Sequence, residues 1–261
     1  MIRLQRSVRF AAAATEGPMD NAFAGWPAAL RGEAWFEAVI TCGGEIDPRA
    51  GYLIDIKEID RVVRQTLVPA AVTMQSAVTP YPNSVLRESL GPMQEALRGL
   101  LQSVRWKLTP YYSLEMTMPH TDRVLMRQRF DFAASHRLFV PGLSDAENAA
   151  LFGKCSRVNG HGHNYQFEPC IEVPLDQAGH SEFSLARLES LVAGLLLERF
   201  DHTHLNLDCP EFSQPGGLNP TVENIARVFY KILAPAVRSN GAGLRSMTVW
   251  ETDRTSAEYG E

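Results

Sequence analysis

The stretch Asn159-Gly160-His161-Gly162-His163-Asn164-Tyr165 places two histidines two positions apart. In a β-strand, side chains two positions apart point to the same face, so the two imidazoles are predicted to lie side by side. The alternating run at residues 130–136, Phe-Asp-Phe-Ala-Ala-Ser-His, predicts a second strand with one apolar face that ends in His136. An antiparallel pairing of the two strands would bring the three histidines together.

Three neutral imidazoles suit Zn²⁺ and leave a fourth position open for water or substrate. Gly162 leaves room for a close ligand approach. A histidine met alone is more often a surface or hydrogen-bonded residue than a ligand, so the hypothesis depends on the third imidazole. We expect His136, His161 and His163 to form a zinc site that serves an enzyme active site.

Cys155 lies in the segment between the two strands, six residues before His161. A thiol near Zn²⁺ and imidazoles has a lowered pKa and can act as a base. Two other interpretations stay open: a small buried apolar residue, or a fourth zinc ligand that closes a structural site.

Two further places carry candidate chemistry. In Asp201-His202 a carboxylate can orient an imidazole and support its charged form, as in a proton relay. Glu251 ends an apolar stretch, and a carboxylate there can accept two parallel hydrogen bonds from the N–H pair of a pterin or guanine edge. The alternatives are ordinary helix-end polarity for Asp201-His202 and a solvated strand end for Glu251.

The composition is that of a packed globular protein: 45% of the 261 residues are hydrophobic and 21% are charged. The net charge is −5, and basic and acidic residues are interspersed, which disfavours nucleic acid as a partner. No apolar run approaches the ~20 residues of a membrane span. Arg9 interrupts the short apolar stretch near the N-terminus, so we expect no signal peptide. Four dispersed cysteines favour free thiols and a cytoplasmic location.

Two weak echoes indicate an internal duplication. Residues 8–14 resemble residues 128–134, and residues 31–35 resemble residues 161–165. In each half a strand pair is followed by two helical stretches, predicted at 54–67 and 84–104, and at 184–200 and 221–233. Closing strands are predicted at 111–118 and 244–252. We therefore expect α+β modules at 1–122 and 123–261.

Five segments resemble the 6-pyruvoyltetrahydropterin synthase family, which includes 6-carboxytetrahydropterin synthase, in the family's order over roughly residues 130–259. They are Phe132-Ala-Ala-Ser-His136, Leu151-Phe-Gly-Lys-Cys155 with Asn159-Gly-His-Gly-His-Asn-Tyr165, Asp201-His202 with Leu205-Asn206, Asn219-Pro-Thr-Val-Glu-Asn224, and Val249-Trp-Glu-Thr252.

The resemblance implies a tunnelling fold, here as tandem modules that each carry an antiparallel four-stranded sheet with two helices on one face. It implies a zinc-dependent carbon–oxygen lyase that acts on 7,8-dihydroneopterin triphosphate with loss of triphosphate. By the same resemblance Cys155 is the base, Asp201 and His202 form the relay, and Glu251 anchors the pterin ring, with Thr221 and Glu223 in the pocket wall. Lys154 and Arg157 lie near the site, but the sequence does not single them out for the triphosphate.

Five residues separate Cys155 from His161, a spacing that resembles the pyruvoyl-forming branch more than the carboxy-forming branch of the queuosine pathway. Two other functions stay open: a non-catalytic scaffold that retains the zinc site, and a zinc hydrolase, for which the sequence places no water-activating carboxylate beside the metal.

The first module departs from the family pattern. The positions that align with the zinc histidines read Glu16, Arg31 and Glu33, which cannot make a three-imidazole site. We therefore expect this degenerate module to bind no catalytic metal. Because sheet edges need partners, we also expect a homo-oligomer.

Overall fold

The computed structural model describes residues 1–12, 34–76 and 81–260. The chain divides into two compact units, Met1–Met126 with Val173–Ser181, and Arg127–Glu172 with Glu182–Glu261. Each unit contains both strands and helices, so the predicted α+β class is confirmed. No helix in the described part of the chain is long and apolar enough to cross a membrane.

The strands of the first unit follow the order β1-β2-β3-β4-β5. They are β1 (Ile2–Ala12), β2 (Ala34–Gly44), β3 (Leu101–Lys107), β4 (Tyr112–Thr117) and β5 (Arg123–Gln128), whose last two residues belong to the second unit. The pairs β1-β2, β2-β3 and β3-β4 are antiparallel. The sheet is therefore larger than the predicted four-stranded module.

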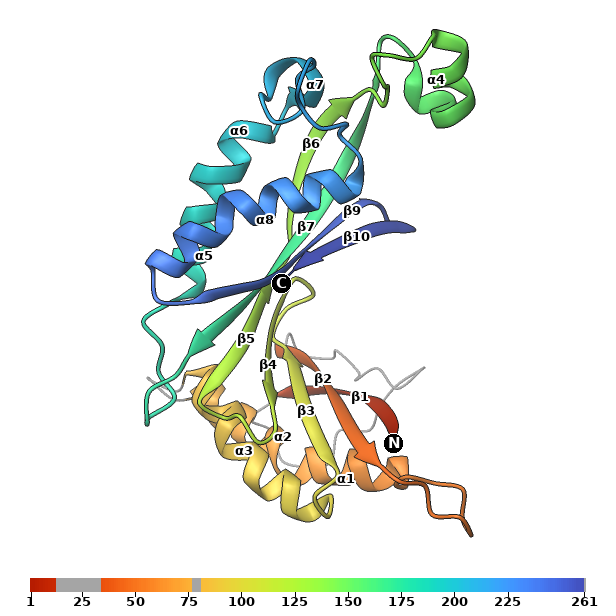
Figure 1. Cartoon of the computed structure of the whole chain (residues 1–261). Coiled ribbons are helices and arrows are strands. Elements are labelled where there is room, and N and C mark those ends of the chain that lie inside the picture. Colours follow the sequence, from red (N-terminus) through yellow and green to blue (C-terminus); the bar gives the residue numbers. More distant parts are fainter. Residues whose placement is uncertain (13–33, 77–80, 261) are drawn as a thin grey trace. The chain divides into compact units, whose positions relative to one another are not determined.

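Three helices cover one face of these strands (Figure 1): α1 (Ile56–Gln65), α2 (Leu67–Ser76) and α3 (Pro82–Ala96). The Asp55 carboxylate caps α1 by accepting a hydrogen bond from the Lys57 N–H at 2.9 Å. The prediction of a helix reaching residue 104 is wrong. The chain leaves α3 at Ala96, turns through Gly99 at φ +79°, and enters β3 at Leu101.

The face of this sheet opposite α1, α2 and α3 carries a part-buried charge cluster around Glu37. Glu37 accepts hydrogen bonds from Arg9 Nε at 3.0 Å and from Lys107 Nζ at 2.6 Å, each on a neighbouring strand. Burial raises the pKa of the Glu37 carboxyl, but the hydrogen bonds from Lys107 and Arg9 outweigh it and leave the pKa lowered. The ionised form is therefore favoured in the folded state.

We expect Glu37→Gln to lower the free energy of unfolding by about 2 kcal/mol at pH 7, because two part-buried cations lose the negative charge of this carboxylate. Urea denaturation followed by circular dichroism measures this. A group with a lowered folded-state pKa stabilises above its unfolded pKa, so the difference should shrink as the pH falls through the carboxyl range. The matched control is Glu45→Gln, whose side chain is 87% exposed. Equal shifts for both variants would contradict the assigned role.

The second unit has the strand order β10-β9-β7-β6-β8. The strands are β6 (Phe130–His136), β7 (His161–Pro174), the two-residue β8 (Thr203–His204), β9 (Gly243–Thr252) and β10 (Thr255–Gly260). All pair antiparallel except β8, which runs parallel to β6. This unit therefore also has more strands than the predicted four-stranded sheet.

Helices α5 (Leu185–Val192) and α6 (Glu198–Phe200), joined by a π-helical turn, precede α8 (Val222–Ser239). Two further helices, α4 (Asp145–Phe152) and α7 (Leu205–Asp208), lie in the connections. Phe229 of α8 packs against Phe132 of β6 and Phe167 of β7, with ring centroids 5.2 Å away in both cases. This aromatic core fixes the face of β6 and β7 that continues to the histidines.

Candidate active site

The register of β6 and β7 brings the three predicted ligands together. His136 lies opposite His161, and Ala134 lies opposite His163. Strand alternation then puts all three imidazoles on the face that also carries Phe132. One ligand atom from each histidine lies within 4.8 Å of the others, and the two Nε2 atoms of His136 and His161 are 3.2 Å apart. Tetrahedral zinc with bonds of about 2.0–2.1 Å separates its nitrogen ligands by roughly 3.4 Å.

The free nitrogens of the cluster fit a metal. His136 Nδ1–H donates to the Pro220 carbonyl at 2.8 Å, which leaves Nε2 unprotonated and able to bind a cation. His161 Nδ1 and His163 Nε2 are buried and have no hydrogen-bond partner among the described residues. A buried polar atom without a partner is costly, and an ion held by His163 Nε2 together with the neighbouring Nε2 atoms of His136 and His161 relieves that cost at His163. The residues present therefore fit Zn²⁺.

Burial keeps His136 and His163 neutral. It lowers the pKa of His136 to about 4, against a smaller opposing effect of the hydrogen bond to Pro220, while the neighbouring imidazoles lower it further. Burial also lowers the pKa of His163, with the Glu251 charge acting in the opposite direction. Metal ligation requires neutral imidazoles, so both side chains are in the binding form at pH 7.

Glu251, on β9, lies beside the cluster. Its Oε1 is 3.6 Å from His136 Nε2 and 3.5 Å from His163 Nε2. No carboxylate could be placed next to the metal site from sequence alone, because the pairing of β9 with β7 joins residues far apart in the chain. A carboxylate at this position can face both a metal ion and a substrate.

Tyr165 is a site residue that the sequence did not single out. Its side chain is fully buried, and its Oη is 3.3 Å from His136 Nδ1. Burial, followed by the charges of Glu251 and Cys155, raises the pKa of the phenol, so it stays protonated. The signal was present, since Tyr165 continues the two-residue spacing of His161 and His163 along the same face.

Cys155 lies in a 3₁₀ turn, η2 (Gly153–Ser156), that follows α4. The Leu138 N–H donates to the Cys155 carbonyl at 2.8 Å and ties this turn to the chain just beyond His136. Cys155 is part-exposed, whereas Cys42, Cys170 and Cys209 are buried, and all four are free. The turn that carries Cys155 is therefore tied to the chain two residues beyond His136.

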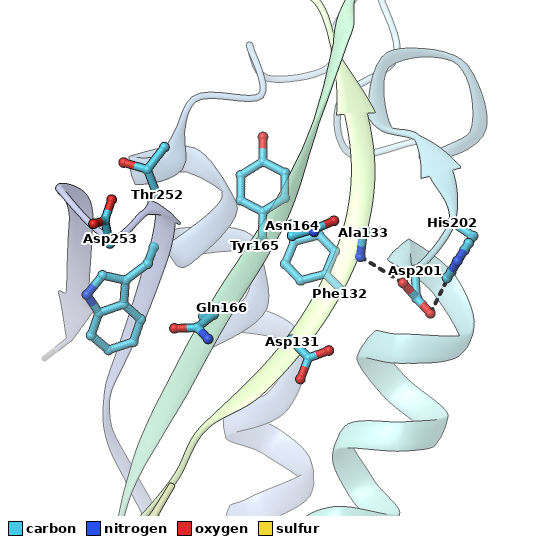
Figure 2. A pocket seen from close by; sticks show the side chains of 11 residues that line it. Asp131, Phe132, Ala133, Asn164, Tyr165, Gln166, Asp201, His202, Thr252 and Asp253 are labelled. Atoms are coloured by element: carbon cyan, nitrogen blue, oxygen red, sulfur yellow. Dashed lines mark hydrogen bonds and ion pairs between the residues drawn. The ribbon is translucent and has the colours of Figure 1, made fainter. Parts of the chain in front are cut away.

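Asp201 and His202 form a pair at the other side of β6 (Figure 2). Asp201 accepts from the Ala133 N–H at 2.8 Å, and its second oxygen is 2.9 Å from His202 Nδ1. Both line a cavity of about 570 Å³ together with the side chains of β6 and β7 that alternate with the histidine-bearing face, Asp131, Asn164 and Gln166. The structure therefore joins the two predicted relay residues to each other but sets them on the face of β6 away from His136.

His202 adopts a left-handed backbone conformation at φ +57°, uncommon for a residue other than glycine. Its N–H donates to the Ala133 carbonyl at 2.6 Å, and its side chain is 82% exposed. The backbone hydrogen bonds hold the imidazole outward, toward solvent, where a partner or substrate can reach it.

Thr221 and Glu223 occupy the start of α8. The Thr221 hydroxyl is the N-cap and accepts from the Asn224 N–H at 3.4 Å, and Glu223 lies in the first turn. The preceding Pro220 carbonyl is the one that orients His136. This helix start therefore lies at the histidine cluster, in a position to form part of its wall.

Glu16, Arg31 and Glu33, expected to replace the histidines in the first module, lie outside the described residues. Over the part of the chain that the structure describes, His136, His161 and His163 are the single group of side chains able to hold a metal ion.

The family model and the similar proteins all point to one family. The family model for 6-pyruvoyl tetrahydropterin synthase matches residues 125–261. The human 6-pyruvoyl tetrahydrobiopterin synthase is 35% identical over 136 residues, which cover 51% of this chain and 88% of the human one. The synthase of Dictyostelium discoideum is 29% identical over 136 residues, covering 52% and 95%. The solved 6-pyruvoyl tetrahydropterin synthase of Caenorhabditis elegans is 32% identical, covers 53% of this chain and 96% of its own, and aligns with a TM-score of 0.48.

The family model spans more than half of the chain and includes every candidate residue of the second unit. The chain belongs to the 6-pyruvoyl tetrahydropterin synthase family and is an enzyme of this family of carbon–oxygen lyases.

Proposed function

We propose that this protein is a zinc-dependent 6-pyruvoyl tetrahydropterin synthase that converts 7,8-dihydroneopterin triphosphate with loss of triphosphate. The observation that carries the proposal is the convergence of His136, His161 and His163 around the buried, unpartnered His163 Nε2. A backbone hydrogen bond ties the turn of the part-exposed Cys155 to the chain just beyond His136. Family membership supplies the class of reaction, and the relatives, named as 6-pyruvoyl tetrahydrobiopterin synthases, support the pterin product.

Zinc held by the three imidazoles would bind the side-chain hydroxyls of the substrate and acidify the neighbouring C–H and O–H bonds. The Cys155 thiolate is the proposed base that removes a proton from carbon. Loss of triphosphate breaks a C–O bond, and the electron pair leaves with the phosphate oxygen. The remaining protons are redistributed within the product, so the reaction needs no external oxidant or reductant.

Glu251 is the proposed anchor of the pterin ring, accepting hydrogen bonds from two ring N–H groups. Glu251 Oε1 lies 3.5 Å from His163 Nε2, so Glu251 could instead act as a ligand of the metal, and the two roles can be separated by mutation.

We expect Glu251→Gln to raise the KM for substrate about tenfold or more while zinc content stays unchanged, because one charge-assisted acceptor becomes neutral. Steady-state kinetics with metal analysis measures both. A large loss of zinc with an unchanged KM would instead assign Glu251 to the metal.

Asp201 and His202 are the proposed proton relay. Because they line the face of β6 away from the histidines, we propose that they act at the site of a second copy in a homo-oligomer. The exposed, backbone-anchored imidazole of His202 supports this assignment.

The first module, residues 1–122, is proposed to be a degenerate tunnelling-fold module without a metal site, in tandem with the catalytic module at 123–261. A structural role is supported by α3, which holds the turn at residues 176–178. Ser84 Oγ donates to the Ala178 carbonyl at 2.9 Å, and Arg87 donates to the Asp176 carbonyl at 2.7 Å.

A cytoplasmic location is proposed because all four cysteines are free thiols.

The product identifies the reaction. Incubation with 7,8-dihydroneopterin triphosphate, followed by mass analysis, should give the 6-pyruvoyl compound together with free triphosphate. A 6-carboxy product would move the protein to the queuosine branch of the family. The absence of any product at full zinc occupancy would favour a scaffold.

A further inference from the structure

In the described part of the chain, no strand pairs with the four residues that follow β6, residues 137–140. The pairing of β6 with β7 ends at His136, and its pairing with β8 ends at Ser135. Backbone N–H groups that leave water need a hydrogen-bond acceptor. All four N–H groups of this segment nevertheless donate hydrogen bonds, so other groups take the place of a neighbouring strand.

Three of the four acceptors are asparagine side chains from three separate elements. Their Oδ1 atoms lie 2.7, 3.2 and 2.7 Å from the backbone nitrogens of residues 137, 139 and 140. In the same order, they are Asn206 of α7, Asn219 in the loop before α8, and Asn148 of α4. We call these three residues the asparagine clamp. Asparagine suits this task because its amide carries both an acceptor and a donor, as a peptide group does.

The fourth N–H connects the segment to the proposed base. Leu138 N–H donates to the Cys155 carbonyl at 2.8 Å, and Arg137 Nε donates to the Ser156 carbonyl, also at 2.8 Å. The segment therefore begins next to a proposed zinc ligand, His136, and holds the turn that carries Cys155. Its conformation decides where Cys155 lies relative to His136.

Asn148 binds the segment through the largest number of contacts. Its side chain is 3% exposed, and its Nδ2 lies 3.1–3.2 Å from three carbonyls, those of Val140, Leu143 and Ser144. Asparagine is a poor helix former inside a helix, so what it contributes within α4 is the hydrogen bonding of its amide. Helix α4 leads directly into η2, and Asn148 thus joins Val140 to the helix that precedes Cys155.

The other two members of the clamp lie closer to His136. Asn206 is 8% exposed, and its Nδ2 donates to the Arg137 carbonyl at 3.0 Å, so one amide pairs with both backbone groups of Arg137. Asn219 precedes Pro220, whose carbonyl accepts the hydrogen bond from His136 Nδ1. The clamp therefore adjoins both the backbone beyond this histidine and the carbonyl that orients its ring.

We propose that the asparagine clamp positions Cys155 relative to His136, and that Asn148 is a positioning residue that acts through Cys155. This rests on the proposed function, in which Cys155 is the base. Proton transfer needs the base within hydrogen-bond reach of the substrate, and a misplacement of about 1 Å can cost about 10²-fold in rate. Because Asn148 bonds to the backbone of residues 140–144, its loss should displace Cys155 and leave the zinc ligands in place.

The variant Asn148→Ala should lower kcat about 10- to 100-fold, while KM and zinc content stay close to those of the unmodified protein. In a Cys155→Ala background the same change should cause no further loss, because the group that Asn148 positions is gone. Losses that multiply in the double variant would overturn the proposal, as would an unchanged kcat in Asn148→Ala.

The matched control is Asn240→Ala, at the end of α8. Asn240 is a part-buried asparagine whose Nδ2 donates to the Ala236 carbonyl at 2.8 Å. Its loss should lower stability without changing kcat. A second pair of variants separates the hydrogen bond from general disruption of the fold. Asn206→Asp keeps the acceptor for the Arg137 N–H and should retain more activity than Asn206→Ala, and equal losses would count against the clamp.

Amide hydrogen exchange tests the clamp without turnover. In the zinc-loaded protein, exchange at residues 138–140 should be about tenfold or more faster in Asn148→Ala than in the unmodified protein or in Asn240→Ala. Unchanged exchange would contradict the clamp even if kcat fell. Failure of the proposed function is recognised separately: an unmodified protein that releases no triphosphate, but whose exchange responds to Asn148→Ala, would refute the proposed reaction and support the clamp.

Discussion

Substitution of His161 by alanine is expected to strip the protein of both zinc and turnover. His161 supplies one of three imidazoles, and its Nε2 lies 3.2 Å from that of His136. Removal of a residue that merely supports a metal ligand already costs about 10- to 100-fold in affinity, so loss of the ligand itself should cost more. Elemental analysis after dialysis, with an assay for released triphosphate, measures both effects. His161 is preferred to the fully buried His136 because its removal disturbs the core less.

The control for this variant is His180→Ala. His180 belongs to the first unit, and its side chain is 50% exposed. It should keep both zinc and activity. A His161→Ala protein that retained stoichiometric zinc after dialysis would show that the metal, if bound at all, lies elsewhere.

Replacement of Cys155 by alanine should lower kcat by about 10²- to 10⁴-fold, the contribution typical of a positioned general base. Zinc content should remain that of the unmodified protein, because Cys155 is proposed as a base and not as a fourth ligand. Steady-state kinetics and metal analysis on the same preparation decide between the two roles. Loss of zinc in this variant would indicate a closed structural site instead.

The thiol also gives an independent readout. Since Cys42, Cys170 and Cys209 are buried, an alkylating reagent should react first with Cys155 in the native protein, and activity should fall in step with labelling.

The proposed relay of Asp201 and His202 can be tested with variants of the same kind. Mixed oligomers of Cys155→Ala and His202→Ala chains should regain activity if Asp201 and His202 serve the site of a second copy. Inactive mixtures would restrict the relay to a single chain.

The short-range features of the second unit could be predicted from sequence periodicity. Strand alternation alone puts His161 and His163 on one face, and the same period along residues 130–136 puts His136 on the apolar face of its own strand. The apolar spacing of α8 and its Thr221 cap likewise follow from local rules. Each of these depends on residues within a few positions of one another.

Features that depend on long-range packing could not be predicted in the same way. The approach of Glu251 to two histidines requires the pairing of β9 with β7. The side of β6 on which Asp201 and His202 lie depends on two hydrogen bonds to the Ala133 backbone, one from its N–H to the Asp201 carboxylate and one to its carbonyl from the His202 N–H. In the first unit the strand β3 begins inside a stretch whose apolar spacing suits a helix, and pairing with β2 decides its conformation.

The central claim is that the histidine cluster holds a zinc ion on which turnover depends. The most direct measurement removes metal with a chelator and follows triphosphate release while zinc is titrated back. The account predicts negligible release without metal and a linear rise to a plateau at about one zinc per chain, as expected for a single three-histidine site. Full release by the metal-free protein would contradict it.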